Sequence, residues 1–362
     1  MTIQDLHFDC IHFRGDMPCR PNKESGKICP TCTDYQPISK RILIIKLGAL
    51  GDVIRTTPLL ERYRKEYPHC HITWITNYPE ILPKDALDCI RTFTFSDVFI
   101  VTKQHFDIAV NLCKDQEAAM LLAECNAKQK FGFIWSDGHL SIANPESEHK
   151  LLTGLFDSFS KANTKSYVDE IFEICGFDYQ QEPYLLNVES KQMDHWSNLK
   201  ESAQSKPIIG LNTGAGSRWP TRLWPEENWK QLIVALKNAG YAPLLLGGND
   251  EHERNTALKQ ETGAMYEGVF PLETFIAISA QCDVIVTAVS MTMHIALGLG
   301  KKMVLFNNIF NKHEFDVFGR GEIIEPETGC DCYYGAQCSR ERICMKDISV
   351  DSVFDAIQRQ LS

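Results

Sequence analysis

The sequence has little of three things that mark particular classes of protein: surplus basic charge, a long apolar run and a leader-like start. Its 37 Lys and Arg are outnumbered by 47 Asp and Glu, for a formal net charge of −10. A nucleic-acid-binding protein usually presents a dominant basic face, so that class is disfavoured. No apolar run approaches the roughly 20 residues that span a bilayer. Residues 1–5 also lack the basic and apolar regions of a signal peptide, so we expect a cytoplasmic protein.

What the chain does have is ordinary globular composition and many cysteines. It holds 362 residues, 44% hydrophobic and 23% charged, enough for two nucleotide-fold domains with appendages. Fourteen cysteines are numerous for a compartment in which disulfides are rare. Six of them lie in apolar stretches, where we expect small core residues. These six are Cys70, Cys89, Cys113, Cys125, Cys175 and Cys282.

The other eight cysteines form one cluster at each end of the chain. Residues 1–40 show no hydrophobic periodicity and cannot bury a core of their own. Within them, Cys29 and Cys32 have the C-x2-C spacing typical of zinc sites. The sequence therefore predicts a Cys-rich cap, residues 1–40, held by a structural zinc or iron ion, the alternative being four reduced thiols. The C-terminal quartet is less regular, and we leave a second metal site there open. The two clusters are Cys10, Cys19, Cys29 and Cys32, and Cys330, Cys332, Cys338 and Cys344.

Apolar strands and helices alternate in two successive series. Each series opens with a β-branched or apolar run followed by a Gly-rich turn, which predicts two doubly wound α/β sheets that face one another. We expect an N-terminal Rossmann-like domain at 41–190, a C-terminal one at 205–330, and a Cys-rich segment with a closing helix at 330–362. Strands are expected at 41–47, 71–76, 97–101, 106–112, 130–134, 207–212, 242–246, 283–287 and 302–306.

In such sheets, ligands bind at the carboxyl ends of the strands. The first candidate loop there is Lys46-Leu-Gly-Ala-Leu-Gly-Asp52. Its glycines let the backbone approach a ligand, and Asp52 could accept a proton from an attacking hydroxyl as a general base. The alternative is that Asp52 caps the following helical turn. The residues assigned to this acceptor-side loop are Lys46, Gly48, Gly51, Arg55 and Thr56.

Two later loops suit a diphosphate. The stretch 212–225 combines small residues and backbone amides with two arginines, which favours a pyrophosphate over the alternative of solvated loop charges. The turn 287–294 runs from a strand into a helix, whose free amides can hold an anion. A lone histidine there, His294, is more often structural. The candidates for phosphate contact are Thr213, Gly214, Gly216, Ser217, Arg218, Arg222, Ser290, Thr292 and His294.

These loops, in this order, resemble glycosyltransferase family nine, the heptosyltransferase-like enzymes of bacterial lipopolysaccharide assembly. The resemblance covers about residues 41–355, and its clearest element is Ile45-Lys-Leu-Gly-Ala-Leu-Gly-Asp-Val-Ile-Arg-Thr-Thr-Pro-Leu-Leu60. It implies a GT-B fold, inverting chemistry without a catalytic metal, and Asp52 as the base. It also implies that Arg222 contacts phosphate and that Glu251 binds a ribose. The chain differs from the family pattern at Val289 and Met291, which leaves the donor sugar open.

The expected function is therefore transfer of a heptose or related sugar from an ADP-heptose-like donor to a hydroxyl of a lipopolysaccharide-core or other surface-glycan acceptor. Such an acceptor would bring the protein into peripheral contact with the inner membrane face. Two alternatives stay open. One is another GT-B activity, a protein-directed glycosyltransferase or a nucleotide-sugar epimerase. The other is a sugar-nucleotide-binding protein without activity.

Overall fold

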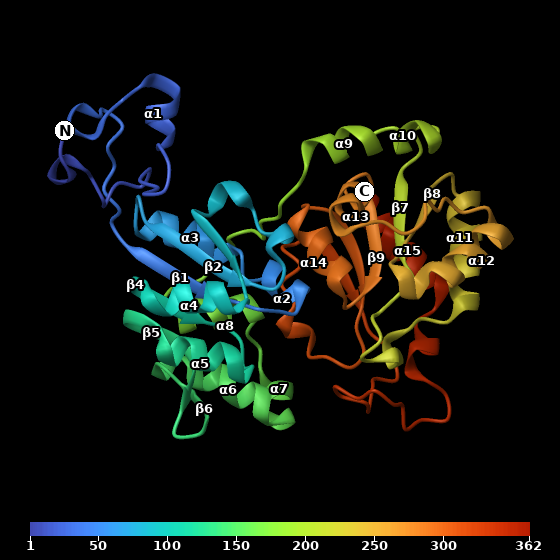
Figure 1. The fold of residues 1–362 in the computed structure, drawn as a ribbon. Coiled ribbons are helices and arrows are strands. Elements are labelled where there is room, and N and C mark those ends of the chain that lie inside the picture. Colours follow the sequence, from blue (N-terminus) through green and yellow to red (C-terminus); the bar gives the residue numbers. More distant parts are fainter.

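The computed structural model describes all 362 residues and contains two β-sheets side by side, each packed against helices (Figure 1). The first sheet has the strand order β3-β2-β1-β4-β5-β6 and the second β11-β10-β9-β7-β8. All neighbouring strands run parallel except β5 and β6, which are antiparallel. The predicted pair of doubly wound α/β sheets is confirmed.

The first sheet is centred on β1, whose residues after Arg41 are completely buried because both faces carry helices. Its strands are β1 Arg41–Ile45, β2 His71–Thr76, β3 Cys89–Thr92, β4 His105–Asn111, β5 Asn126–Ser136 and β6 His139–Ile142. Its helices are α2 Leu50–Ile54, α3 Pro58–Glu66, α4 Phe95–Lys103, α5 Gln116–Glu124, α6 Glu148–Leu155, α7 Asp157–Ala162 and α8 Tyr167–Ile174.

The second sheet has fully buried central strands of the same kind. Two short helices, α9 Ser190–Trp196 and α10 Leu199–Ser202, lie in the polar crossing between the sheets. The strands are β7 Ile208–Asn212, β8 Ala242–Leu246, β9 Val284–Ala288, β10 Lys302–Phe306 and β11 Gly321–Ile324. The helices are α11 Glu226–Asn238, α12 His252–Thr262, α13 Leu272–Ser279, α14 Met291–Gly298 and α15 Val350–Leu361.

One predicted strand is wrong: residues 97–101 belong to helix α4. The Thr94 hydroxyl accepts a hydrogen bond from the Asp97 amide, which caps the helix start. Val101 is the only buried residue of this helix, and Phe95 and Phe99 are exposed. The β-branched composition of the segment therefore reflects no sheet, and only Val101 takes a core position. The strand of this region is β3, a few residues earlier, and the short edge strands β6 and β11 were also missed.

The N-terminal cap projects beyond the start of β1 (Figure 1). It contains helix α1 Arg20–Ser25 and two 3-10 turns, Ile3–Asp5 and Cys29–Thr31. Pro21 is its only buried residue, so the segment has no hydrophobic core. The two halves of the molecule meet where α2 packs against α14. In the whole chain, no helix is both long and apolar enough to cross a bilayer.

Candidate active site

Asp52 lies in α2, immediately beyond the carboxyl end of β1. Its carboxylate pairs with Arg55 at 2.8 Å and with Lys46 at 3.6 Å, and its side chain is 32% exposed. Helix α2 is preceded by Ala49 as its N-cap, so the Asp52 side chain does not cap it. Burial alone would raise the pKa of Asp52, but the adjacent Arg55 and Lys46 lower it well below its usual range. The Asp52 carboxyl is therefore ionised at neutral pH and can accept a proton.

His294 of α14 lies directly against this loop from the other half of the molecule. A Cβ added at Gly51 would sit 2.5 Å from the His294 Cδ2 atom, so only glycine allows this approach. Burial and the positive charge of Arg55 lower the pKa of His294 to about 3. Its Nδ1 atom is buried without a hydrogen-bond partner. The imidazole is thus neutral and forms part of the contact between the two halves.

A cavity of about 590 Å³ opens beside Asp52, and we call it the acceptor-side pocket. It brings Asp52 together with Lys46, Gly48 and Arg55, as the sequence predicted for one loop. It also contains residues that the sequence analysis missed, because they come from separate elements. Of these, Lys114 follows β4 and Trp219 lies in the loop after β7, so their places after strands were signals in the sequence. The main missed residues are Lys114, Lys150, Tyr167, Trp219, Glu314 and Tyr334.

A second cavity, of about 530 Å³, is lined by Leu50 of α2 and by Met291 and Thr292 of α14, and we call it the donor-side pocket. Its wall joins the carboxyl ends of β7, β8 and β9, where ligands bind in doubly wound sheets. Aromatic residues Tyr78, Phe270 and Phe275 also line it and were not predicted. The predicted residues that it gathers are Gly214, Gly216, Arg222, Glu251, Ser290 and Thr292.

Arg222 is the one basic residue that lines the donor-side pocket, beside the acidic Glu80, Asp250 and Glu251. It is 7% exposed, and its guanidinium donates to the carbonyl oxygens of Ala215, Val289 and Trp219. It forms no ion pair with a carboxylate. Burial lowers the pKa of Arg222 to about 10. A buried cation without an acidic partner is costly, and a bound anion would offset that cost.

Other predicted residues lie elsewhere. Arg218 stacks over Trp219, 4.4 Å from the ring centroid, and lines the acceptor-side pocket instead of the donor-side one. The Thr213 hydroxyl donates to Asn255 at 2.7 Å inside the protein, and Ser217 lines neither pocket. The Thr56 hydroxyl donates to the Asp52 carbonyl oxygen at 2.7 Å. These side chains do not point at a common ligand.

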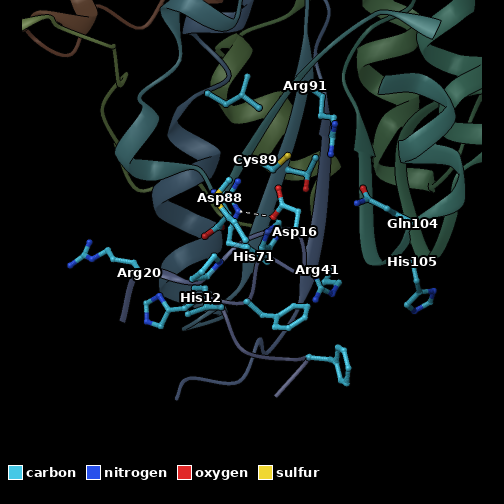
Figure 2. Close-up of a pocket in the computed structure, with 18 of the residues that line it drawn as sticks. His12, Asp16, Arg20, Arg41, His71, Asp88, Cys89, Arg91, Gln104 and His105 are labelled. Atoms are coloured by element: carbon cyan, nitrogen blue, oxygen red, sulfur yellow. Dashed lines mark ion pairs between the residues drawn. The ribbon is translucent and has the colours of Figure 1, made fainter. Parts of the chain in front are cut away.

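A third cavity, of about 1280 Å³, shares no lining residue with either pocket and lies between the cap and the amino ends of β1 to β4 (Figure 2). Arg41, His71 and His105 mark those strand starts. Cys89 also lines it and is only half-buried, so the expectation that it is a core residue is wrong, whereas the other five expected core cysteines are buried. Because ligands of parallel sheets bind at the opposite edge, we do not place the active site here.

The clustered cysteines are only partly brought together. Nowhere in the chain do three or more Cys, His, Asp or Glu form a group that could hold a metal ion as arranged. The four cysteines of the cap nevertheless line one cavity of about 320 Å³. At the C-terminus, the Cys330 sulfur accepts a hydrogen bond from the Cys332 amide at 3.4 Å. The Cys344 sulfur accepts one from the Asn308 side chain at 3.5 Å.

Two Rossmann-like α/β sheets whose halves meet at α2 and α14 have the architecture of the GT-B class of glycosyltransferases. Residues 100–313, more than half of the chain, match the model of "Glycosyltransferase family 9 (heptosyltransferase)". The chain belongs to this family and is thereby a glycosyltransferase.

Known relatives support this family membership. Lipooligosaccharide heptosyltransferase 2 of Haemophilus influenzae is 23% identical over 290 residues, 73% of this chain and 82% of the relative. Lipopolysaccharide heptosyltransferase 2 of Salmonella typhimurium is 32% identical over 109 residues, 28% of this chain. That alignment spans 31% of the relative's length, less than a third.

Solved structures agree with the fold. A family 9 glycosyltransferase from Veillonella parvula superposes with a TM-score of 0.68 at 22% identity, covering 90% of this chain and 97% of the other. ADP-heptose LPS heptosyltransferase II of E. coli gives 0.65 at 18%, covering 89% and 98%. The iron-containing dodecameric glycosyltransferase TibC of enterotoxigenic E. coli gives 0.54 at 15%, covering 90% and 77%.

Proposed function

We propose that this protein is an inverting glycosyltransferase of lipopolysaccharide-core or other surface-glycan assembly. It moves a heptose or related sugar from a nucleotide-diphosphate sugar to an acceptor hydroxyl. Support comes from the names of its relatives, which are heptosyltransferases of lipopolysaccharide and lipooligosaccharide. A heptosyltransferase of similar fold, WaaC of E. coli, is known in structures with ADP and with a fluorinated ADP-heptose.

The observation that carries the proposal is that both pockets border α2: Asp52 lines the acceptor-side pocket, and Leu50 lines the donor-side pocket together with Arg222. The acceptor-side pocket has an ionised carboxylate, and the donor-side pocket has a buried cation with no acidic partner. A single displacement needs a proton acceptor near the attacking hydroxyl and stabilisation of the leaving diphosphate on the opposite side of the anomeric carbon. The two pockets supply one each.

In the proposed mechanism, Asp52 accepts the proton of the acceptor hydroxyl while that oxygen forms a bond to the anomeric carbon of the sugar. The bond from that carbon to the diphosphate oxygen breaks with its electron pair. Arg222 and the free amides at the start of α14 stabilise the charge on the departing diphosphate. Arg55 and Lys46 keep Asp52 ionised, so it takes up the proton as the attacking oxygen becomes acidic. Glu251, whose carboxylate accepts the Gly248 amide at 2.8 Å, lines the donor-side pocket as the proposed ribose contact.

The test is a product assay with ADP-heptose and truncated lipopolysaccharide cores, analysed by mass spectrometry and by NMR of the new anomeric centre. The expected product is the acceptor plus one heptose, with the anomeric configuration opposite to that of the donor. A product with retained configuration contradicts the displacement. Conversion of the donor to another nucleotide sugar, without transfer, would indicate an epimerase instead. ADP binding without any turnover would indicate a binding protein.

We also propose that the cap binds a structural zinc or iron ion through Cys10, Cys19, Cys29 and Cys32. These thiols line one cavity in a segment without a core, and metal ligation would draw them together. In elemental analysis of the purified protein, Cys29→Ser should contain about one metal ion per chain fewer than wild type, whereas Cys89→Ser should contain as much metal as wild type. Retention of all metal in Cys29→Ser would contradict the assignment to the cap.

A second metal at Cys330, Cys332, Cys338 and Cys344 is proposed on a different basis. A relative in fold, TibC, contains iron, and amide hydrogen bonds to sulfur such as that of Cys330 are favourable for thiolate ligands. No step of the transfer passes through either metal. Loss of a second equivalent of metal in Cys338→Ser supports this site, and an unchanged metal content contradicts it.

Finally, we propose peripheral contact with the inner membrane face through Leu155, Phe156 and Phe159. These side chains are 60%, 51% and 48% exposed and adjoin Gly154 and Asp157 of the acceptor-side pocket. Exposed aromatic residues beside a glycolipid site favour an interfacial position. Phe156→Ser/Phe159→Ser should reduce cosedimentation with phospholipid vesicles, whereas Val234→Ser, exposed on the other domain, should not. Equal sedimentation of both variants and wild type would contradict the contact.

A further inference from the structure

We propose that the acceptor-side pocket contains a subsite for an oxyanion of the acceptor, formed by Lys114, Lys150 and the Tyr167 hydroxyl. The inference rests on the proposed transfer function and names the chemical class of the acceptor: a glycan that carries a phosphate or carboxylate near the reacting hydroxyl.

Lys114 provides the central charge of this subsite. It follows β4 at the carboxyl edge of the sheet, and its ammonium group donates to the Lys150 carbonyl oxygen at 2.7 Å. A Cβ at Gly154 would collide with this ammonium group, so the glycine leaves room for it against the backbone. Lys114 forms no ion pair. A largely buried cation of this kind is stabilised when a ligand supplies the missing negative charge.

The charged neighbours of Lys114 already have partners of opposite charge or hydrogen bonds. Lys150 of α6 pairs with the buried Glu170 of α8, and Lys46 pairs with Asp52. Glu314, in the turn after β10, accepts the Tyr334 hydroxyl at 2.8 Å. Lys114 is therefore the one cation among these groups without an ion pair, and Glu314 is the one carboxylate without one. The negative charges of Glu170 and Glu314 partly offset the lowering of the Lys114 pKa.

Tyr167 gives an independent indication of a missing ligand. It is 4% exposed, and its hydroxyl is buried without a hydrogen-bond partner. Its ring lies 3.5 Å from the Arg55 guanidinium and 4.8 Å from the Lys150 ammonium, and it lines the same pocket. An unsatisfied buried hydroxyl is unfavourable, and an oxyanion would accept its hydrogen bond.

The arrangement has a definite pH dependence. Burial, with the like charge of Lys150, lowers the pKa of Lys114 to about 8. The ammonium form binds the oxyanion, and the bound oxyanion in turn raises the pKa. Affinity for the acceptor should therefore fall as the pH rises through about 8. In Lys114→Arg, which stays charged, this fall should disappear.

The binding test labels lysines with an acetylating ester and follows each one by mass spectrometry as a function of pH. Lys114 should react with a midpoint near pH 8, and inorganic phosphate should slow its reaction several-fold at that pH, relative to chloride of equal ionic strength. Acetate in a parallel series distinguishes a carboxylate site from a phosphate site. The exposed Lys103 of α4 is the control, and its rate should not change. Protection of Lys114 by neither anion would overturn the subsite.

The kinetic test uses the acceptor found by the product assay. Lys114→Gln should raise the KM for acceptor at least tenfold with the KM for donor unchanged, and Gly154→Ala, which displaces the ammonium group without removing it, should act in the same direction. Lys103→Gln should match wild type. An unchanged acceptor KM in Lys114→Gln contradicts the proposal. If the wild type transfers no sugar, the proposed function fails, but the labelling test still decides whether the subsite exists.

Discussion

Replacing Gly51 with alanine tests whether the contact between α2 and α14 sets the geometry of transfer. The new methyl group would lie 2.5 Å from His294 Cδ2, about 0.9 Å short of ordinary van der Waals contact. His294 is buried and cannot swing into solvent. The two halves must therefore separate by a large part of this distance.

The expected loss of activity in Gly51→Ala follows from two effects. Overpacking of this kind costs about 1–3 kcal/mol of stability. A displacement of about 1 Å between reacting groups can cost roughly 10²-fold in rate. Gly51→Ala should therefore lower kcat by about two orders of magnitude, with a smaller effect on ADP affinity, because the donor-side pocket belongs mainly to the second half.

The assay is steady-state transfer at saturating donor and acceptor, with thermal unfolding followed in parallel. The double variant Gly51→Ala/His294→Ala removes the collision and should recover the activity of His294→Ala alone. A near-wild-type kcat in Gly51→Ala would refute the reasoning. So would a double variant no better than Gly51→Ala when His294→Ala alone is active.

Three further predictions concern single charges. Arg55→Gln removes the ion-pair partner that lies 2.8 Å from Asp52 and should raise the pKa of the Asp52 carboxyl. Because Asp52 must be ionised to accept a proton, the loss of kcat/KM on the acid side should move to higher pH. An unchanged pH profile would contradict the pairing. Arg222→Gln should weaken ADP binding, measured by calorimetry, about 10- to 100-fold, because a hydrogen bond to a charged group contributes about 1.5–3 kcal/mol. Arg222→Lys should have an intermediate affinity. Equal ADP affinities of the wild type and Arg222→Gln would exclude Arg222 from the donor site. Arg62→Ala leaves the buried Glu182, which lines neither pocket, without its ion-pair partner. It should destabilise the fold by about 3–5 kcal/mol without changing the KM for donor. An unchanged unfolding midpoint would show that this pair contributes little.

The sheets could be predicted because most of their strands are short apolar runs that can be recognised in the local sequence. Residues 71–76, 242–246 and 302–306 are apolar runs whose bounds coincide with β2, β8 and β10. The run at 97–101 has the same composition but is a capped surface helix. Its backbone hydrogen bonds are made within the helix. Composition alone cannot show that Phe95 and Phe99 face solvent.

The site was predictable where one loop carries it, and not where several elements converge. Asp52, Lys46 and Arg55 lie within ten residues of one another, and Arg55 pairs with Asp52 across one helical turn. Tyr167 and Lys150 reach the same pocket from α8 and α6, much later in the chain. Arg218 and Arg222 look equivalent in sequence, but the 3-10 turn Pro220–Arg222 directs them to different pockets.

The central claim is that the Asp52 carboxylate removes the proton of the acceptor hydroxyl, opposite a separate donor site. The most direct measurement compares the transfer rate of Asp52→Asn with its affinity for ADP. General base catalysis contributes about 10²–10⁴-fold, so transfer should fall by that factor while ADP affinity stays within about twofold of wild type. Transfer near the wild-type rate by a correctly folded Asp52→Asn protein would contradict the account.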